Sequence, residues 1–433
     1  MPDSITTAGL DAATLRRRAI LSCIVGNLFE LFDFGVYGYF AAAIGRSIFP
    51  SANPINSILS SFATYGVGFL MRPVGAMVIG SYGDRYGRKS ALVLTVTMMA
   101  TATGLTGLVP SYATIGLAAP ALLVLCRLLQ GFSTGGEWGG AASFMVEYAP
   151  PGHRAFFGSL QQVSTGLGQL CSITAAFVLN STLSQADVTS WGWRVPFLIG
   201  FALAPVGYWL RTRVAETPVF ENIATQDRLE AAPLRVAFGK YLGPIAQAFG
   251  ITIIWTVASY MFFTFLPTYA TSQLHMLAST AFASALIAAI VHVLLLPCFG
   301  TLADRIGRKP LMLTCAAGFL VLAYPLFSYL VTERSFQAML TVQLCGAVLY
   351  AMINSCASAV LCEMFPTQIR YTALSVGYNA AVMIFGGFAP FIATFLIKIT
   401  GQPIAPTYYV MACAFMSLIV ILRVQDRTNA PLM

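Results

Sequence analysis

Long apolar stretches limit what this chain can fold into more than any other feature of its sequence. Of its 433 residues, 57% are apolar and only 9% are charged, whereas a soluble domain carries about 25% charged residues. A stretch of roughly 20 apolar residues is long enough to cross a bilayer as a helix. Because a soluble protein with so little charge would expose large apolar patches, we predict that most of the chain lies in lipid.

Twelve such stretches follow one another, and the longest polar segment separates the first six from the last six. This pattern predicts an all-α membrane protein whose twelve transmembrane helices form two six-helix bundles, residues 1–210 and 246–433, joined by a cytoplasmic linker, residues 211–245. The predicted spans are 20–43, 57–79, 90–109, 118–145, 156–180, 194–210, 246–270, 280–300, 311–331, 338–361, 371–397 and 407–422.

Basic residues indicate how the spans are oriented, because Lys and Arg gather on the cytoplasmic side of membrane proteins. With the N-terminus inside, 18 of the 24 Lys and Arg residues lie in predicted cytoplasmic segments and four lie in outer loops. We therefore predict that both termini are cytoplasmic. The same bias accounts for the net charge of +8, so the charge does not indicate nucleic acid as a partner.

Two pairs of short motifs repeat at nearly the same distance along the chain. Residues 80–89, GSYGDRYGRK, match residues 300–309, GTLADRIGRK; residues 147–154, EYAPPGHR, match residues 363–370, EMFPTQIR. The repeat predicts a duplicated six-span unit. In such proteins the halves are related by an axis along the membrane normal, and the substrate site lies between them.

The motif loops carry side chains that suit a gate. An aspartate at the end of one helix can accept hydrogen bonds from the N-terminus of a neighbouring helix and pair with arginine, and glycines let helices approach closely. We predict a charged cytoplasmic gate that forms in one state and breaks in the other; the alternative is that these basic residues only set the topology. The predicted gate residues are Gly80, Asp84, Arg85, Gly87, Arg88, Glu147, Arg154, Asp304, Arg305, Gly307, Arg308, Glu363 and Arg370.

Residues 80–89 and 300–309 resemble the G-x-x-x-D-R-x-G-R-K signature of the major facilitator superfamily. Further segments resemble one branch of it, the metabolite:proton symporter family, which includes citrate, 2-oxoglutarate, shikimate and proline/betaine carriers. These segments are 26–34 (GNLFELFDF), 68–73 (GFLMRP), 127–138 (RLLQGFSTGGEW), 191–197 (WGWRVPF), 216–220 (ETPVF) and 370–379 (RYTALSVGYN). The resemblance implies two six-helix bundles, alternating access and proton-driven import across a bacterial inner membrane.

Five charged side chains fall inside the predicted spans, where a charge at the bilayer centre costs at least ~2.5–3.5 kcal/mol. They are Glu30, Asp33, Arg72, Arg127 and Glu137. Glu30 and Asp33 lie one turn apart on one helix face and repel when both are ionised. We predict them as the leading proton-coupling pair, with Glu137 as the third candidate. Either arginine can pair with the acid that stays charged or bind a substrate carboxylate; the alternative is a static network that holds the first bundle together.

Uncharged polar side chains in the predicted spans can orient a ligand, although each can equally be a packing residue. All five charged side chains within the predicted spans lie in the first half, so we expect coupling there and hydrogen bonding to substrate in the second half. The predicted substrate-binding residues are Arg72, Arg127, Asn27, Tyr37, Gln161, Tyr260, His292, Tyr378 and Asn379.

These features predict a secondary active transporter that couples proton symport to uptake of a small organic acid. We favour a di- or tricarboxylate such as citrate; the alternatives are shikimate-like acids and zwitterionic osmolytes such as proline or betaine. A channel, a membrane enzyme and a non-transporting nutrient sensor are less favoured, because the sequence contains no filter motif, nucleophile–base pair, metal cluster or sensor domain. We expect a monomer in the bilayer that needs no cofactor or metal, with the proton as coupling ion.

Overall fold

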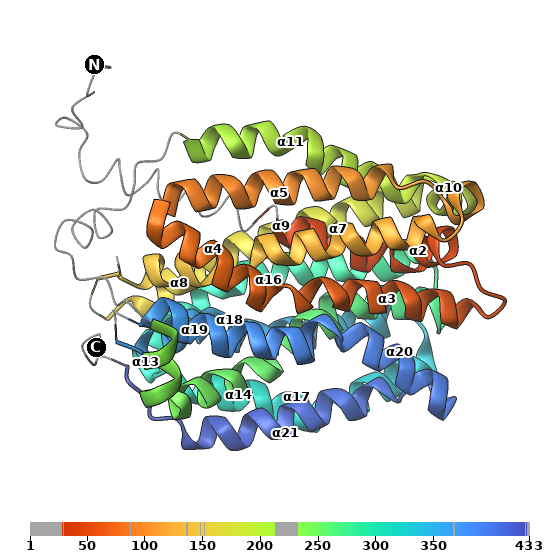
Figure 1. The fold of residues 1–433 in the computed structure, drawn as a ribbon. Helices are drawn as coiled ribbons and strands as arrows, with labels where there is room; N and C mark the ends of the chain where they lie inside the picture. Colours follow the sequence, from red (N-terminus) through yellow and green to blue (C-terminus); the bar gives the residue numbers. More distant parts are fainter. Residues whose placement is uncertain are drawn as a thin grey trace, which may run out of the picture.

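The fold is given by a computed structural model, which describes residues 28, 30–86, 88–135, 137–147, 149–150, 152–212, 233–366, 369–428 and 430. Every regular element in these residues is a helix. The long helices lie side by side with their axes roughly aligned (Figure 1).

The first half contains six long helical paths and several short turns. Residues 30–39 are helical and lead into the next helix. In chain order the elements are α2 (Ala41–Ile48), α3 (Pro54–Leu70), α4 (Arg72–Tyr86), α5 (Arg88–Leu108), α6 (Tyr112–Ile115), α7 (Ala118–Thr134), α8 (Glu137–Glu147), α9 (Arg154–Thr182), α10 (Gln185–Ser190), the 3₁₀ turn η1 (Gly192–Arg194) and α11 (Val195–Thr212).

The second half repeats this arrangement and adds two π-helical segments. Its elements are α13 (Pro233–Lys240), α14 (Leu242–Ala258), the π-helix η2 (Ser259–Phe265), α15 (Leu266–Ser272), α16 (Ala278–Ile306), α17 (Lys309–Glu333), α18 (Phe336–Glu363), α19 (Arg370–Ala381), the π-helix η3 (Val382–Gly387), α20 (Ala389–Thr400) and α21 (Pro406–Arg423).

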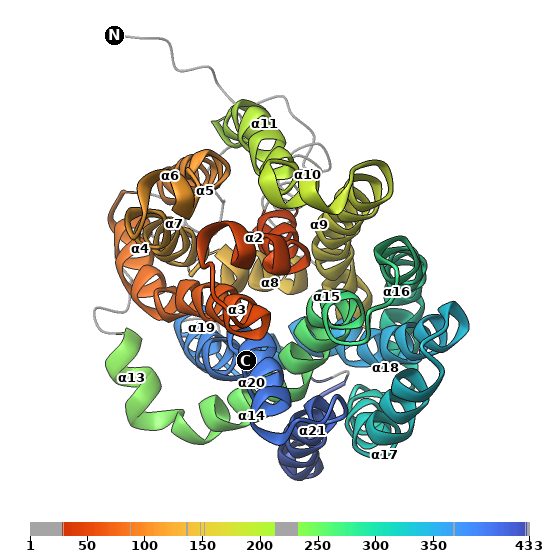
Figure 2. The same cartoon turned by 90° about the vertical axis from the view of Figure 1, so that its right-hand side faces the viewer.

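The two halves form separate groups of helices when viewed along the bundle (Figure 2). Helix α9 of the first half packs against α16 and α18 of the second, α3 packs against α20, and α8 packs against α19. These contacts make the interface between the halves, and the side chains that it brings together lie far apart in the sequence.

Apolar side chains cover the outside of the bundle, as lipid requires. Eight helices among the described residues are long and apolar enough to cross a membrane, and the shorter apolar helices 93–108 and 118–134 lie beside them. Leu294 and Val321 are 65% and 67% exposed, whereas Asp33 and Arg127 are 1% and 0% exposed. Because lipid offers no hydrogen bonds, the polar groups are gathered inside.

Several predicted boundaries differ from the observed ones. The seventh predicted span begins earlier, at Leu242, and the predicted linker contains helix α13; residues 213–232 of that linker lie outside the described part. The predicted span 118–145 is divided into α7 and α8 near Gly135. A Cβ atom at Gly135 would clash with the Arg72 carbonyl oxygen, so the backbones of α7 and α4 touch here.

The π-helical segments lie within the second-half helices that border the interface. η2 contains Tyr260, and η3 ends in Gly386 and Gly387. A Cβ atom at Gly386 would meet Tyr260, and one at Gly387 would meet the Phe69 ring of the first half. Single π-turns inside α-helices are frequent at functional sites, so both segments indicate a functional site in the region around Tyr260 and Phe69.

Candidate substrate and proton site

Glu30 and Arg72 form a buried ion pair in the first half. Arg72 Nη2 lies 2.6 Å from Glu30 Oε1, and the two side chains are 4% and 5% exposed. Arg72 begins α4 directly after the turn at Met71, and Pro73 suits the first turn of a helix because its missing N–H needs no partner there. A charged pair this deep is stable only because each charge offsets the other.

Aromatic rings surround the Arg72 guanidinium. Its Cζ atom lies 4.6 Å from the centroid of the Phe69 ring and 5.1 Å from that of the Phe34 ring. Tyr260 reaches across from the second half, with its ring 5.5 Å from that of Phe69 and 6.0 Å from that of Tyr65. Arg72 and Tyr260 were predicted as substrate-binding residues. Tyr65 was not, because no periodic signal in the sequence distinguishes its ring from lipid-facing aromatics.

Asp33 lies in a second network. Arg127 Nη1 donates to Asp33 Oδ2 at 3.1 Å, while Thr103 Oγ1 and Gln130 Nε2 each donate to Asp33 Oδ1 at 2.8 Å. Arg127 Nη2 also donates to Thr106 Oγ1 at 3.3 Å. Thr103 and Gln130 were not predicted as partners of Asp33, since nothing in a single sequence indicates which spans lie next to the first one.

The two acids therefore have separate arginines rather than sharing one. Glu30 pairs with Arg72 beside the interface, and Asp33 pairs with Arg127 inside the first bundle. Three side chains of the first half donate hydrogen bonds to Asp33, and they occupy both of its carboxylate oxygens. A proton added to either oxygen would therefore face a donor group.

Tyr37 belongs to the Asp33 side of this arrangement. Its hydroxyl donates to the Ser61 carbonyl oxygen at 3.1 Å, and its ring lies 4.6 Å from Arg127 Cζ. The predicted substrate-binding residues Tyr37 and Arg127 thus contact other residues of the first half in this structure.

Trp138 of the first half stacks on Tyr378 of the second. Their ring centroids are 3.9 Å apart with an interplanar angle of 13°, and Trp255 lies 5.4 Å from both rings. Next to this stack, Asn379 Nδ2 donates to the Gly135 carbonyl oxygen at 3.3 Å. Tyr378 and Asn379 were predicted as substrate-binding residues, and the structure places both at the interface of the halves.

His292 lies at the end of a polar chain in the second half. Trp255 Nε1 donates to Asn354 Oδ1 at 2.8 Å, and Asn354 Nδ2 lies 3.2 Å from His292 Nε2. The Asn354 amide can only donate through this nitrogen, so His292 Nε2 accepts and the imidazole is neutral. The ring also stacks on Tyr350, with centroids 4.7 Å apart.

Gln161 and Gln162 join the halves through one serine. Ser358 Oγ of α18 donates to Gln161 Oε1 at 2.9 Å and accepts from Gln162 Nε2 at 2.9 Å. Gly158 lets the helices approach, since a Cβ atom there would lie 3.3 Å from Ser358 Cβ. In this state Gln161 is thus an interface residue, and the structure adds Ser358 to the set.

Charged residues join the halves at the end of the bundle that carries the C-terminus. Glu363 accepts from Arg154 Nη1 at 3.2 Å and from Arg308 Nη1 at 2.7 Å. Asp304 accepts the backbone N–H groups of Ala155 and Phe156, each at 2.9 Å, at the N-terminus of α9. We call these contacts of Arg154, Asp304, Arg308 and Glu363 the latch, and this end of the bundle the latch face.

The remaining described gate candidates lie near the latch. Arg308 Nη2 is 3.3 Å from Asp304 Oδ1. Gly307 ends α16 with φ of 94°, a conformation that favours glycine. Arg370 is buried, and its Nε donates to the carbonyl oxygens of Cys362 and Phe365 in its own half, whereas Arg305 is exposed.

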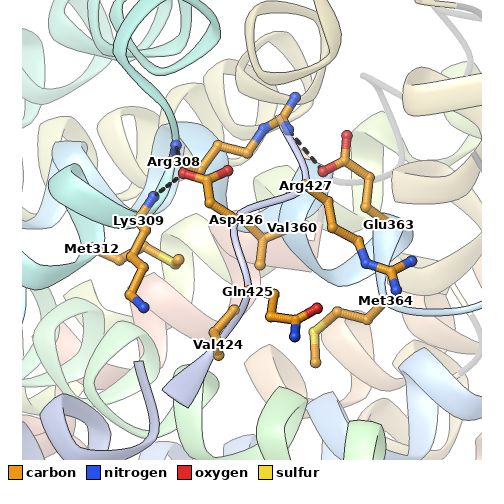
Figure 3. Close-up of a pocket in the computed structure, with 10 residues that line it drawn as sticks. All are labelled: Arg308, Lys309, Met312, Val360, Glu363, Met364, Val424, Gln425, Asp426 and Arg427. Atoms are coloured by element: carbon orange, nitrogen blue, oxygen red, sulfur yellow. Dashed lines mark hydrogen bonds and ion pairs between the residues drawn. The ribbon is translucent and has the colours of Figure 1, made fainter. Parts of the chain in front are cut away.

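The C-terminal segment crosses the latch face. Asp426 Oδ2 accepts the backbone N–H groups of Arg308 at 3.0 Å and Lys309 at 3.1 Å, and a shallow pocket lies between these residues and Glu363 (Figure 3). Arg154 Nη1 donates to the Ala430 carbonyl oxygen at 2.6 Å. Partial burial raises the pKa of Asp426, but hydrogen bonds from Thr428 and these backbone amides outweigh burial and hold the pKa below its ordinary value.

The halves also touch at the opposite end of the bundle. Thr268 Oγ1 of α15 donates to the Gly38 carbonyl oxygen at 3.1 Å. The rings of Tyr39 and Phe282 meet edge to face with centroids 5.8 Å apart. The halves are therefore in contact at both ends of the bundle.

Several predicted site residues lie wholly or in part outside the described part of the chain. Asn27 and Gly87 lie outside the described residues, and helix backbone alone is described for the others. These others are Gly80, Asp84, Arg85, Arg88, Glu137 and Glu147.

Comparison with known protein families matches both halves of the chain. Residues 19–235 match the model of the sugar (and other) transporter family. Residues 277–432 match the model of the major facilitator superfamily. The chain belongs to the major facilitator superfamily. It is a multi-pass membrane transporter with twelve helices in two six-helix bundles, as the sequence predicts.

Curated relatives of this transporter cover nearly the whole chain. The citrate-proton symporter of Klebsiella pneumoniae is 36% identical over 411 residues, which cover 94% of this chain and 91% of that protein. The proline/betaine transporter of Escherichia coli K12 is 34% identical over 430 residues, which cover 96% of this chain and 85% of that protein.

Solved structures share the fold. The xylose transporter XylE from E. coli, in a partially occluded inward-open conformation, has a TM-score of 0.76 over 95% of this chain and 98% of that chain, at 16% identity. At this identity the likeness shows the fold alone.

Proposed function

We propose that this transporter couples inward proton movement to uptake of a small carboxylate-bearing solute by alternating access. The observation that carries the proposal is the buried Arg72–Glu30 pair beside the interface of the halves. One relative is a citrate-proton symporter, which supports proton coupling for this chain.

Coupling follows from competition for one guanidinium. When Glu30 is ionised it holds Arg72 Nη2 at 2.6 Å. A proton on Glu30 removes the negative charge and frees Arg72 for a substrate carboxylate, which then supplies the balancing charge. Since an unpaired charge is costly at this depth, the proton and the carboxylate enter together and leave together.

Asp33 takes a structural role in this scheme. Arg127, Thr103 and Gln130 donate to it, and these partners lie in the first bundle. We propose Glu30 rather than Asp33 as the proton carrier, which narrows the pair that the sequence predicts.

We propose a di- or tricarboxylate such as citrate as the first candidate substrate. Arg72 offers the planar fork of donors that suits a carboxylate, and a citrate-proton symporter is 36% identical to this chain. Asn379 and Gln161 lie at the interface of the halves, where their amides can reach further oxygens once the halves move.

A zwitterionic solute of the proline or betaine type is the second candidate, and aromatic side chains at the interface of the halves favour it. Cations bind over the faces of Trp, Tyr and Phe rings, and Trp138, Trp255 and Tyr378 lie together at the interface. A proline/betaine transporter is 34% identical over 96% of the chain.

Uptake into proteoliposomes tests the function and separates the candidates. Purified protein should accumulate radiolabelled citrate or radiolabelled glycine betaine when the outside is acidic and the inside is negative. Collapse of both gradients with a protonophore and valinomycin should abolish accumulation but leave counterflow exchange intact. Accumulation that persists without either gradient, or flux without counterflow, would contradict proton symport.

We further propose that the latch face is cytoplasmic and that the chain is an inner-membrane monomer. The support is the excess of basic residues in the loops at this end. Labelling of single engineered cysteines near Asp426 and near Arg334 with an impermeant maleimide in whole cells would check the orientation, since only the Arg334 site should react.

A further inference from the structure

Tyr65 stands out among the buried residues near Arg72 because its hydroxyl has no described partner. The side chain is 0% exposed, and its OH makes no hydrogen bond within the described part of the chain. A buried hydroxyl without a partner costs free energy, so a residue that keeps one at a binding site is a candidate for ligand contact. If the hydroxyl had no role, phenylalanine at this position would avoid the cost.

Arg72 has an unused donor in the same region. Its Nη2 contacts Glu30, but its Nε makes no hydrogen bond with any described residue. Nε and Nη2 share one edge of the guanidinium, and this edge matches the two oxygens of a carboxylate. Glu30 therefore leaves half of the fork unoccupied, and a carboxylate that took the whole fork would displace it.

Tyr65 and Arg72 border the same ring. The Tyr65 ring lies 5.4 Å from the Phe69 ring, and Arg72 Cζ lies 4.6 Å from it. Positions 65, 69 and 72 fall on one face of the helical path 54–79, because side chains four and three residues apart line up. Tyr260 closes this face from the second half.

We propose that the Tyr65 hydroxyl and the Nε–Nη2 edge of Arg72 bind one carboxylate group of the transported solute. The carboxylate accepts two hydrogen bonds from Arg72 and one from Tyr65, and Glu30 must be protonated to release Nη2. The proposal rests on the proposed function and assigns Tyr65 as a substrate-binding residue that selects for the carboxylate. No covalent step is involved.

Tyr65→Phe tests the proposal because it keeps the ring and removes only the hydroxyl. The KM for radiolabelled citrate or glycine betaine, whichever the wild type accumulates, should rise about tenfold, since a hydrogen bond to a charged group is of this strength. The maximal rate and the pH dependence of uptake should stay within about twofold, because Glu30 and Arg72 remain.

Tyr269→Phe is the matched control. Tyr269 is also fully buried, but its hydroxyl donates to the Pro403 carbonyl oxygen at 2.7 Å, so this variant should lose stability without a change in KM. The ligand-induced shift of the melting temperature gives a second readout that needs no transport. At the ligand concentration that saturates the wild type, this shift should be smaller in Tyr65→Phe than in Tyr269→Phe.

The outcomes separate this inference from the function on which it rests. Unchanged KM and an unchanged ligand-induced shift in Tyr65→Phe would overturn the assignment of Tyr65 while leaving proton symport intact. Absence of gradient-driven accumulation of either probe by the wild type would overturn the proposed function itself. If Tyr65→Phe lowers the maximal rate and the KM stays unchanged, Tyr65 acts in the transition between states and the proposal is wrong.

Discussion

Arg154 of the first half and Glu363 of the second form an ion pair across the interface, with Arg154 Nη1 3.2 Å from Glu363 Oε1. Glu363 also holds Arg308 at 2.7 Å, so one carboxylate joins two arginines from different halves. Arg154 is the last residue of the E-x-x-P-x-x-x-R motif in the first half, and Glu363 is the first residue of the same motif in the second half. The duplicated motif thus supplies both sides of one contact.

Glu363→Gln should make the latch face open more often. The change leaves Arg154 and Arg308 without their shared charge, and a loss of about 1.4 kcal/mol shifts an equilibrium tenfold. Hydrogen exchange of the Ala155 and Phe156 amides, which Asp304 accepts in the closed latch, should become about tenfold faster. Glu333→Gln, an exposed change at the opposite end of α17, should leave this exchange unchanged; equal rates in both variants would refute the role of the latch.

Glu30→Gln should uncouple transport from the proton gradient. Glutamine keeps the shape and a hydrogen-bond acceptor but cannot carry a proton away, so Arg72 no longer changes partners with protonation. Accumulation driven by an acidic exterior should fall to the level seen with a protonophore, whereas counterflow exchange should continue. Wild-type accumulation in this variant would rule out Glu30 as the proton carrier, with Glu333→Gln again as the control.

Asp33→Asn should mainly destabilise the fold. Removing one partner of a buried ion pair typically costs 3–5 kcal/mol because the other charge stays buried, and Arg127 is 0% exposed. The melting temperature in detergent should fall by several degrees, and folded protein should keep gradient-driven uptake. The double variant Asp33→Asn with Arg127→Met should recover part of the loss. A stable single variant without gradient-driven accumulation would instead make Asp33 the proton carrier.

Docking of the C-terminal segment should depend on pH through Asp426. Its pKa lies below the ordinary value in the folded protein, so the contact is fully stabilising above the ordinary Asp pKa of about 3.9 and is lost as the pH falls through the lowered folded value. Exchange of the Arg308 and Lys309 amides, corrected for intrinsic rates, should be constant from neutral pH down to about that value. Asp426→Asn should show fast exchange at neutral pH, and Asp187→Asn should not. Fast exchange in the wild type at mildly acidic pH would contradict this sign.

Gly131→Val should prevent correct packing of α7. A Cβ atom at Gly131 would clash with the Gly68 carbonyl oxygen of α3, and backbone atoms cannot move aside as a flexible side chain can. Folded yield by size exclusion should fall to near zero. Gly243→Val is the matched control, because nothing lies within 4 Å of a Cβ atom at that position. Normal yield of both variants would show that α3 and α7 do not approach as closely as described.

Much of the fold could be predicted from the sequence for a physical reason. Lipid offers no hydrogen bonds, so each span must be a helix of about 20 apolar residues. The local sequence therefore determines where each span lies along the chain. The same reasoning identified Glu30 and Arg72, because a charge in an apolar stretch is costly and therefore conspicuous. Neither the division of the helix near Gly135 nor the π-helical segment at Tyr260 was predicted, since both depend on contacts with neighbouring helices.

The pairing of the charges was decided by the tertiary structure alone. The sequence indicated two acids and two arginines, but whether Glu30 or Asp33 faces Arg72 depends on how α4 and α7 lie against the first span. Likewise the stack of Trp138 on Tyr378 joins residues of opposite halves. The Tyr65 hydroxyl has no hydrogen-bond partner among the described residues, and only the packing around it shows this. Hydropathy and repeats are properties of short segments, whereas ion pairs and binding sites between helices arise from packing.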